Sequence, residues 1–378
     1  MKIAMLTTWF PPIIVGSGNR FYEIGRRISK KYEVHIYTAH VEGCNREEER
    51  DGMVIHRYGK FDIPKSKSIE GDYHISKLKF SCKVLWEGLK MRDFDIVDCN
   101  VVSKPLSYVS HFISRSSDAP LILTWHEVWY EKNFESLNPF LALPGFFLEL
   151  FIPKLSDINI AVSATTKRRL IKLLGVDPGK VVEIPNGVDL REFEMSVEKK
   201  YGRILYAGRL ERHKKVDSLI LAYKRLKRIF PEIELIIVGS GPQKVFLQKL
   251  AKELHIDVKF YEPLPRRKLI ELMKSSWIFV LPSIREGQGI VLLEAMAAGT
   301  PPIAVKAEGS AVGDIVKNNY NGILISQSEM ENAIKRLLMN EDLHTSLREN
   351  GLKFVRNYNW DEIAKRVAKL YERIVRGC

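Results

Sequence analysis

Short runs of apolar residues alternate along the chain with longer segments in which apolar residues recur every three or four positions. The short runs are typical of strands buried in a parallel sheet, and the longer segments are typical of helices that cover such a sheet. Two series of strands are predicted: Lys2–Leu6, Val34–Tyr37, Ile96–Val97, Leu121–Thr124 and Ile158–Val162, then Arg203–Ala207, Glu234–Val238, Val258–Phe260, Trp277–Leu281 and Pro302–Val305. Helices are predicted at Tyr22–Ser29, Val216–Phe230, Gln243–Leu254, Arg267–Lys274 and Trp360–Arg376. This alternation predicts doubly wound α/β domains.

The length of the chain favours two domains, because 378 residues exceed what one ordinary hydrophobic core organises. A charged stretch without apolar periodicity, Asp189–Lys200, is the predicted linker. It separates a first domain at residues 1–190 from a second domain at residues 200–360. Residues 42–72 are polar and irregular, and a long loop or excursion is predicted there.

Ligands of open α/β sheets bind outside the carboxyl ends of the strands, so the loops that follow the predicted strands are the candidate binding segments. If the two domains face each other, these loops meet at one cleft. The loops are Trp9–Gly18, Thr124–Trp129, Gly208–Lys215, Gly239–Pro242 and Ser283–Gly289.

The net charge of +13 indicates an anionic partner, or simply a solvated lysine-rich surface. Nucleic acid is disfavoured, because the basic runs Lys224–Arg228 and Arg266–Lys268 lack interleaved aromatic residues. The four cysteines have neither metal-ligand spacing nor a paired pattern, which indicates free thiols in the cytoplasm. The N-terminus resembles a first strand rather than a signal peptide.

One apolar stretch, Pro139–Leu155, is too short and too interrupted by proline to cross a bilayer, and no run of about 18 apolar residues exists elsewhere. Two interpretations stay open for this stretch. It is a core helix, or it is a surface that meets a membrane or a lipid acceptor at the inner face of the membrane. The basic residues Lys167–Arg169 nearby suit anionic headgroups or the wet face of a helix.

The most informative segment is Glu-Gly-Gln-Gly-Ile-Val-Leu-Leu-Glu, residues 286–294. Gly287 and Gly289 let the backbone approach a ligand closely, and the start of the helix that follows offers N–H groups to an anion. Glu286 and Glu294 at the two ends accept hydrogen bonds from hydroxyl groups. The layout suits a sugar nucleotide, with the diphosphate at the helix start, Glu286 on the sugar and Glu294 on the ribose.

This segment resembles the E-x7-E signature of the retaining glycosyltransferases of family 4, which have the GT-B fold. The resemblance extends from Pro282-Ser283 to Gly299, and two further markers stand in the expected order. They are Pro185-Asn186-Gly187-Val188-Asp189, and Gly208-Arg209-Leu210 followed by Lys214. Together these motifs cover essentially the whole chain.

The resemblance implies a donor-binding second domain, an acceptor-binding first domain, and a C-terminal helix, residues 361–378, that packs back on the first domain. The transferred sugar, the base and the acceptor stay open: a glycan, a lipid-linked or a small molecule. By this resemblance His126, Glu286, Arg209 and Lys214 are catalytic. The implied donor-binding residues are Gly16, Arg209, Lys214, Glu286, Gly287, Gln288, Gly289, Ile290, Glu294 and Leu264.

The sequence departs from the family pattern in several of its binding loops. Lys215 stands where glycine is common, Val15 replaces one of two adjacent glycines before Ser17, and Gln288 replaces a frequent aromatic residue. No cofactor and no metal is expected, since GT-B enzymes usually need no bound metal, and Asp93-Phe94-Asp95 is therefore rejected as a metal site.

Other enzyme classes fit less well. Gly16-Ser17-Gly18 lacks the third glycine of a dinucleotide fingerprint, because Phe21 occupies that position. A GT-B phosphorylase or epimerase is the enzyme alternative, although no lysine motif for pyridoxal phosphate stands out. The alternative outside the enzymes, a basic nucleic-acid binder, is the weakest of these hypotheses.

Overall fold

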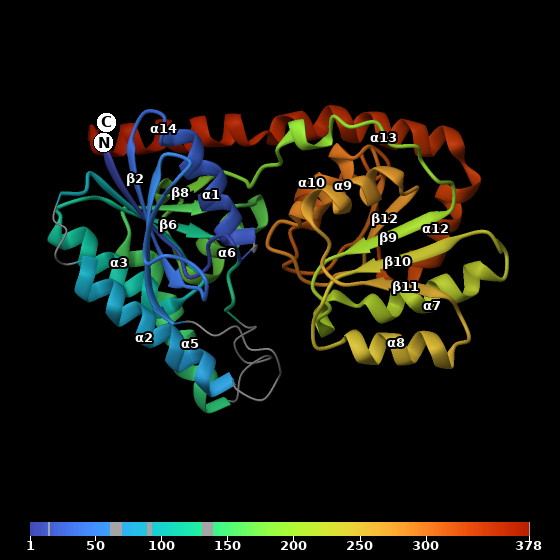
Figure 1. Ribbon diagram of the computed structural model, residues 1–378, viewed down its shortest axis with the longest axis horizontal. Coiled ribbons are helices and arrows are strands. Elements are labelled where there is room, and N and C mark those ends of the chain that lie inside the picture. Colours follow the sequence, from blue (N-terminus) through green and yellow to red (C-terminus); the bar gives the residue numbers. More distant parts are fainter. Residues whose placement is uncertain (14–15, 61–69, 89–92, 131–138, 378) are drawn as a thin grey trace. The chain divides into compact units, whose positions relative to one another are not determined.

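The computed structural model describes residues 1–13, 16–60, 70–88, 93–130 and 139–377. Contacts divide the chain into two compact units (Figure 1). Unit 1 consists of Met1–Asn186 with Trp360–Cys378, and unit 2 is Gly187–Asn359. The chain therefore passes from unit 1 to unit 2 between Asn186 and Gly187, before the predicted linker Asp189–Lys200. That charged stretch belongs to unit 2 because Phe193 is buried in its core and the Phe193 carbonyl accepts a hydrogen bond from Nζ of Lys274 at 2.9 Å.

Unit 1 contains an eight-stranded sheet, counted over the described residues, with the order β3-β4-β2-β1-β5-β6-β7-β8. Neighbouring strands are parallel except β3 and β4. The strands are β1 Lys2–Leu6, β2 Glu33–His40, β3 Glu47–Arg50, β4 Met53–Lys60, β5 Ile96–Asn100, β6 Leu121–Trp125, β7 Ile158–Ala161 and β8 Val181–Glu183. The helices are α1 Gly16–Ile28, α2 Glu70–Gly88, α3 Lys104–Ser116, α5 Pro139–Phe151, α6 Ala164–Leu174 and α14 Trp360–Val375.

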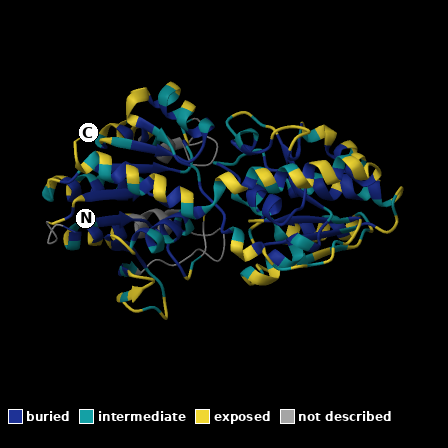
Figure 2. Cartoon of the chain, turned by 90° about the horizontal axis from the view of Figure 1, so that it is seen from above, coloured by how far each residue is buried: buried dark blue, intermediate teal, exposed yellow. Residues whose placement is uncertain are grey.

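Both faces of this sheet are buried, which explains the uninterrupted apolar run of β1. Ile3 and Met5 belong to one core cluster, whereas Ala4 and Leu6 point to the other face and belong to a second cluster. Figure 2 shows the central strands in the buried colour, and exposed positions on the outer faces of the helices and on the edge strand β3. Helices cover both faces, as a doubly wound fold requires.

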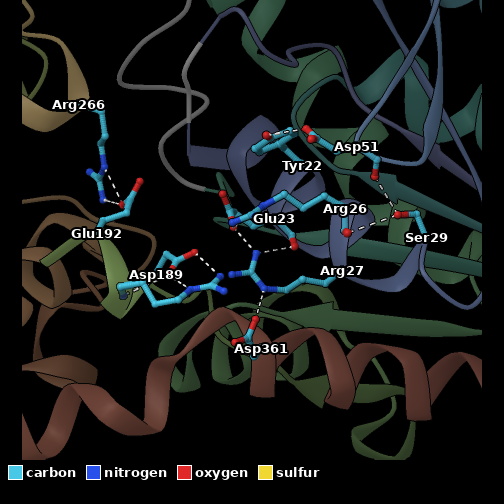
Figure 3. A network of polar contacts seen from close by, with 11 residues as sticks. Tyr22, Glu23, Arg26, Arg27, Ser29, Asp51, Asp189, Glu192, Arg266 and Asp361 are labelled. Carbon is cyan, nitrogen blue, oxygen red and sulfur yellow. Dashed lines mark hydrogen bonds and ion pairs between the residues drawn. The ribbon is translucent and has the colours of Figure 1, made fainter. Parts of the chain in front are cut away.

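The C-terminal helix α14 packs on unit 1, as the resemblance implied. Its buried residues recur at helical spacing and join the core cluster that contains Ile3 and Met5; they are Trp360, Ile363, Ala364, Val367, Leu370 and Tyr371. An ion pair fastens the helix to α1, because Nε of Arg27 lies 2.5 Å from Oδ1 of Asp361 (Figure 3). Arg27 also pairs with Glu23 within α1.

The prediction of a long loop at residues 42–72 holds for residues 42–46, which contain no helix or strand, and is wrong for residues 47–60 and 70–72. Residues 47–60 form the β3–β4 hairpin, and β4 adds to the sheet beside β2. The sequence did not predict β4, because polar residues follow its apolar positions Met53 and Ile55. Arg57 is fully buried and donates to Oε1 of Glu48 and to the Pro11 carbonyl, both at 2.8 Å. Residues 61–69 lie outside the described residues.

Unit 2 contains a six-stranded parallel sheet with the order β11-β10-β9-β12-β13-β14. One core cluster packs around it. The strands are β9 Arg203–Ala207, β10 Glu234–Val238, β11 Val258–Tyr261, β12 Ile278–Leu281, β13 Pro302–Val305 and β14 Ile323–Ile325. The helices are α7 Val216–Lys227, α8 Lys244–Glu253, α9 Arg266–Ser275, α10 Ile290–Ala297, α11 Val312–Ile315, α12 Met330–Met339 and α13 Glu341–Val355. The prediction of two doubly wound α/β domains is confirmed.

Candidate functional site

The strand order of unit 2 places two of the predicted binding loops at one point. The chain builds β10 and β11 on one side of β9 and β12 to β14 on the other, so the order reverses between β9 and β12. Ligands of doubly wound sheets bind at such a switch point, outside the carboxyl ends of the strands. The loops that follow β9 and β12 are linked there, because the Ile284 N–H donates to the His213 carbonyl at 3.1 Å.

Glycines let the loops after β9 and β10 touch backbone to backbone. A Cβ atom on Gly239 would lie 1.9 Å from the carbonyl oxygen of Gly208, and one on Gly241 would lie 2.5 Å from that of Leu210. The Leu210 N–H also donates to the Ser240 carbonyl at 2.8 Å. Any larger residue at these two positions would push the loops apart, so close packing explains both glycines.

Lys214 and Glu286 form an ion pair at the switch point. Nζ of Lys214 lies 2.8 Å from Oε1 of Glu286, and both side chains are largely buried. The Glu286 backbone is held as well, since its carbonyl accepts from the Ala311 N–H at 2.8 Å. Lys215, the departure from the glycine of the family, has φ 51° and ψ 37°. The loop thus keeps the left-handed conformation that glycine favours, at a cost of about 1–2 kcal/mol.

Arg209 has a different partner from Lys214. Its Nη2 lies 2.5 Å from Oε1 of Glu211, and the Arg209 side chain is 74% exposed. The Arg209 carbonyl accepts from the Tyr206 hydroxyl at 2.8 Å. The structure therefore fixes the backbone of Arg209 through Tyr206 and leaves its guanidinium at the surface.

The segment from Gly287 to Ile290 leads into helix α10. Gly289 precedes the helix with φ 83°, and its carbonyl accepts from the Leu292 N–H at 2.9 Å. Gln288 is buried, so it contributes to packing of the loop. The helix start offers backbone N–H groups that suit an anion, and anion binding there stays a prediction.

Glu294 lies one turn into α10 and pairs with a residue that sequence reasoning did not select. Oε1 of Glu294 contacts Nη1 of Arg266, and Arg266 also donates from Nη2 to Oε2 of Glu192 at 2.7 Å (Figure 3). Burial lowers the pKa of Arg266, but Glu294 and Glu192 outweigh this effect and hold it above its usual value. Leu264, two residues before α9, packs against the core of unit 2.

The remaining predicted residues lie in unit 1. His126 directly follows β6, and its Nε2 lies 2.9 Å from Oδ1 of Asn100, the last residue of β5. Burial and the cation of Arg20 lower the pKa of His126 to about 3, so the imidazole is neutral at physiological pH. Gly16 is the first residue of α1. Asn100 was missed by sequence reasoning, although a polar residue at the end of a buried strand is a usable signal.

A buried polar network continues below His126 on the same face of β5. Asp98 accepts from the Thr124 hydroxyl at 2.9 Å and from the Tyr371 hydroxyl of α14 at 2.5 Å. Burial raises the pKa of Asp98 to about 6 and lowers that of Arg20 to about 10. Arg20 donates to the Pro185 carbonyl at 2.8 Å. This network ties the C-terminal helix to the strands that carry Asn100 and His126.

The rejected metal motif has structural partners instead. Oδ2 of Asp93 pairs with Nζ of Lys2 at 2.7 Å, and Oδ2 of Asp95 accepts from the Lys2 N–H at 2.7 Å. Both carboxylates thus fasten the first residue of β1. The absence of a metal requirement stays a prediction.

Comparisons with known proteins agree across the chain. Residues 14–192 match the family model described as Glycosyltransferase Family 4, and residues 190–354 match the model Glycosyl transferases group 1. An uncharacterized glycosyltransferase of Methanocaldococcus jannaschii is 30% identical over 417 residues, covering 98% of each chain.

Solved structures agree with the fold. Sucrose-phosphate synthase from Thermosynechococcus elongatus superposes with a TM-score of 0.85 at 20% identity, covering both chains fully. Anabaena HepE in complex with UDP-glucose has a TM-score of 0.78 at 17% identity, covering 98% of this chain and 99% of that chain. The chain therefore belongs to glycosyltransferase family 4 and has the GT-B fold.

Proposed function

We propose that this protein transfers a hexosyl group from a nucleoside-diphosphate sugar to an acceptor hydroxyl, with retention of the anomeric configuration. The observation that carries the proposal is the Lys214–Glu286 ion pair at the switch point of unit 2, next to glycine loops packed backbone to backbone. The pair presents an ammonium group for a diphosphate beside a carboxylate for sugar hydroxyls. The similarity to a protein solved with UDP-glucose supports a donor of this class.

In this scheme, different residues of unit 2 bind different parts of the donor. Lys214 and Arg209, with the N–H groups at the start of α10, offset the charge that grows on the leaving diphosphate. Glu286 accepts hydrogen bonds from the transferred sugar, and Glu294 accepts them from the ribose. Because protein cations and amides neutralise the diphosphate in this scheme, no metal is needed.

Retention follows most simply from a same-face route, in which the leaving phosphate helps to deprotonate the acceptor. A double displacement would need a nucleophile below the anomeric carbon. Glu286 and Glu294 are engaged by Lys214 and Arg266, and both are assigned to hydroxyls. The neutral His126 orients the sugar and stabilises an oxocarbenium-like state.

A binding experiment tests the donor class. Nucleoside diphosphates and their sugars, with uracil, guanine and adenine as bases, are titrated calorimetrically. The matching one should bind, and Lys214→Met should weaken it about 10- to 150-fold, the range for losing hydrogen bonds to a charged group. Lys215→Met is the matched control and should change affinity less than threefold. Failure of every nucleotide to bind, or equal losses in the two variants, would reject the proposed site.

Helix α5 supports a lipid surface as the place where the acceptor is met. Its carboxylate points inward: Glu149 is buried, pairs with Nζ of Lys104 at 3.3 Å and accepts from the Trp129 N–H at 2.6 Å. Its apolar residues Phe147 and Phe151 are instead 51% and 53% exposed. A helix that buries its charge and exposes its aromatic rings suits an apolar environment outside the protein.

The membrane contact has its own test. The protein should sediment with vesicles that contain anionic lipid, and Phe147→Glu with Phe151→Glu should abolish this. Val245→Glu with Phe246→Glu is the control of equal charge on α8, where both side chains are exposed. Wild-type protein that stays in the supernatant would remove the membrane from the proposal. Within the described part of the chain, no helix is both long enough and apolar enough to span a bilayer.

A further inference from the structure

We propose that Asn100 is a positioning residue that fixes His126 as the Nε2–H tautomer and links its ring to the start of α1. The functional meaning of this arrangement rests on the proposed glycosyl transfer, in which His126 faces the transferred sugar. The geometry itself belongs to unit 1 alone and can be tested without any substrate.

Asn100 lies at the switch point of the sheet in unit 1. The strand order places β2 and β4 on one side of β1 and β5 to β8 on the other, so the order reverses between β1 and β5. Asn100 ends β5 and is fully buried. Its Nδ2 donates to the Thr7 hydroxyl, just beyond β1, at 3.1 Å, and to the Ser17 carbonyl of α1 at 3.0 Å.

These two bonds determine the orientation of the amide and hence the tautomer of His126. The Ser17 carbonyl is an acceptor only, so the amino group of Asn100 must face it and the Oδ1 atom must face His126. Oδ1 is likewise an acceptor only. The ring nitrogen 2.9 Å away, Nε2, must therefore carry the proton, and Nδ1 is left as the acceptor of the neutral ring.

Burial lowers the pKa of His126, and the nearby cation of Arg20 lowers it further, so the ring stays neutral. Arg20 of α1 is buried and directs its guanidinium to the Pro185 carbonyl, while Asp98 of β5 accepts a hydrogen bond from the Tyr371 hydroxyl of α14. Glu127 is the neighbour of His126 in sequence. A neutral Nδ1 accepts a hydrogen bond from a sugar hydroxyl and offers its lone pair to developing positive charge, neither of which an imidazolium can do.

The same amide positions the segment around Gly16. Ser17, whose carbonyl Asn100 holds, lies between Gly16 and Gly18. Gly18 is packed against the end of the β1 loop, since a Cβ atom there would lie 2.3 Å from the Trp9 carbonyl oxygen. One buried side chain thus fixes both parts of unit 1 that the sequence placed in the active site, the Gly16 loop and His126.

The test reads the tautomer directly by 15N NMR of the free protein with labelled histidine. The chain has nine histidines, so the His126 signal is identified by its absence in His126→Gln. The wild-type ring should give the Nε2–H pattern, and Asn100→Ala should give a mixture of both tautomers. Asn100→Asp, which places a carboxylate on Nε2–H, should raise the titration midpoint of His126 by about 1–3 pH units.

Thr124→Val is the matched control, because it removes a hydrogen bond to Asp98 on the same two strands and leaves Asn100 intact. It should keep the wild-type pattern. An Nδ1–H ring in the wild type, or a pure Nε2–H ring in Asn100→Ala, would overturn the proposal. Neither result would count against nucleotide binding. Failure to bind any nucleotide would overturn the proposed function but would not count against the proposed tautomer.

Discussion

Replacing Glu294 with alanine should weaken nucleotide binding strongly and destabilise the protein only slightly. In the structure, Glu294 contacts Arg266, which also holds Glu192 through Nε at 3.0 Å and Nη2 at 2.7 Å. Arg266 therefore keeps a partner when Glu294 is removed. The pair is partly exposed, and such pairs contribute about 0–1 kcal/mol to stability.

The loss of affinity should be larger than the loss of stability. If the Glu294 carboxylate accepts hydrogen bonds from the ribose, its removal costs about 1.5–3 kcal/mol of binding free energy, or about 10- to 150-fold in Kd. Calorimetry with the matching nucleoside diphosphate measures this, and thermal unfolding of the same variant measures the stability. The two numbers separate a ligand contact from a structural ion pair.

Glu192→Gln is the control, because it disturbs Arg266 from the other side without touching the proposed ribose contact. It should change Kd less than threefold and lower stability about as much as Glu294→Ala. The reasoning is refuted if Glu294→Ala binds the nucleotide with wild-type affinity. It is also refuted if Glu192→Gln loses as much affinity, since Glu294 would then matter only through Arg266.

Three further predictions concern catalysis and pH. His126→Ala should lower turnover about 10²- to 10³-fold with little change in nucleotide affinity. NMR of the early product of the wild-type enzyme should show the anomeric configuration of the donor, and an inverted product would contradict retention. Transfer should persist in excess EDTA, and a loss that magnesium restores would revive a metal role. The pKa of His126 is lowered to about 3 and that of Asp98 is raised to about 6, so their substitution should change the pH dependence of stability in opposite directions. Measured by urea unfolding and relative to wild type, His126→Gln should gain stability as pH falls from about 6.5 to 4, whereas Asp98→Asn should gain stability as pH rises from about 4 to 6. Each gain should be up to about 1.4 kcal/mol per pH unit.

The strands were predictable where one physical pattern dominates. In β1, β9, β10 and β13 the predicted and observed bounds coincide, because both faces of each strand are covered and the apolar run is uninterrupted. The prediction failed at β4, where buried Arg57 and His56 break the pattern. Their burial depends on partners such as Glu48, which pairs with Arg57 across the hairpin, and a local pattern does not contain that information.

The candidate site was likewise predictable only in part: its residues were selected, but their contacts were not. Glu286 and Lys214 were each selected from their motifs, but their contact across 72 positions follows only from the strand order that places β9 beside β12. Arg266 was noted only as part of a basic run, yet it pairs with Glu294. Candidate residues can therefore be selected from the motif of a loop, whereas the partner that orients each side chain depends on the topology of the sheet.

The two units make this dependence concrete, because each places a polar contact at its own switch point. In unit 2 the contact joins the loops after β9 and β12 through Lys214 and Glu286. In unit 1 it joins the ends of β1 and β5 through Thr7 and Asn100. Ligands of doubly wound sheets bind at such switch points, outside the carboxyl ends of the strands, so the polar contacts there hold the loops that would border a ligand. A polar residue at the end of a buried strand next to a switch point, such as Asn100, is thus a candidate site residue because of its position in the sheet as well as its type.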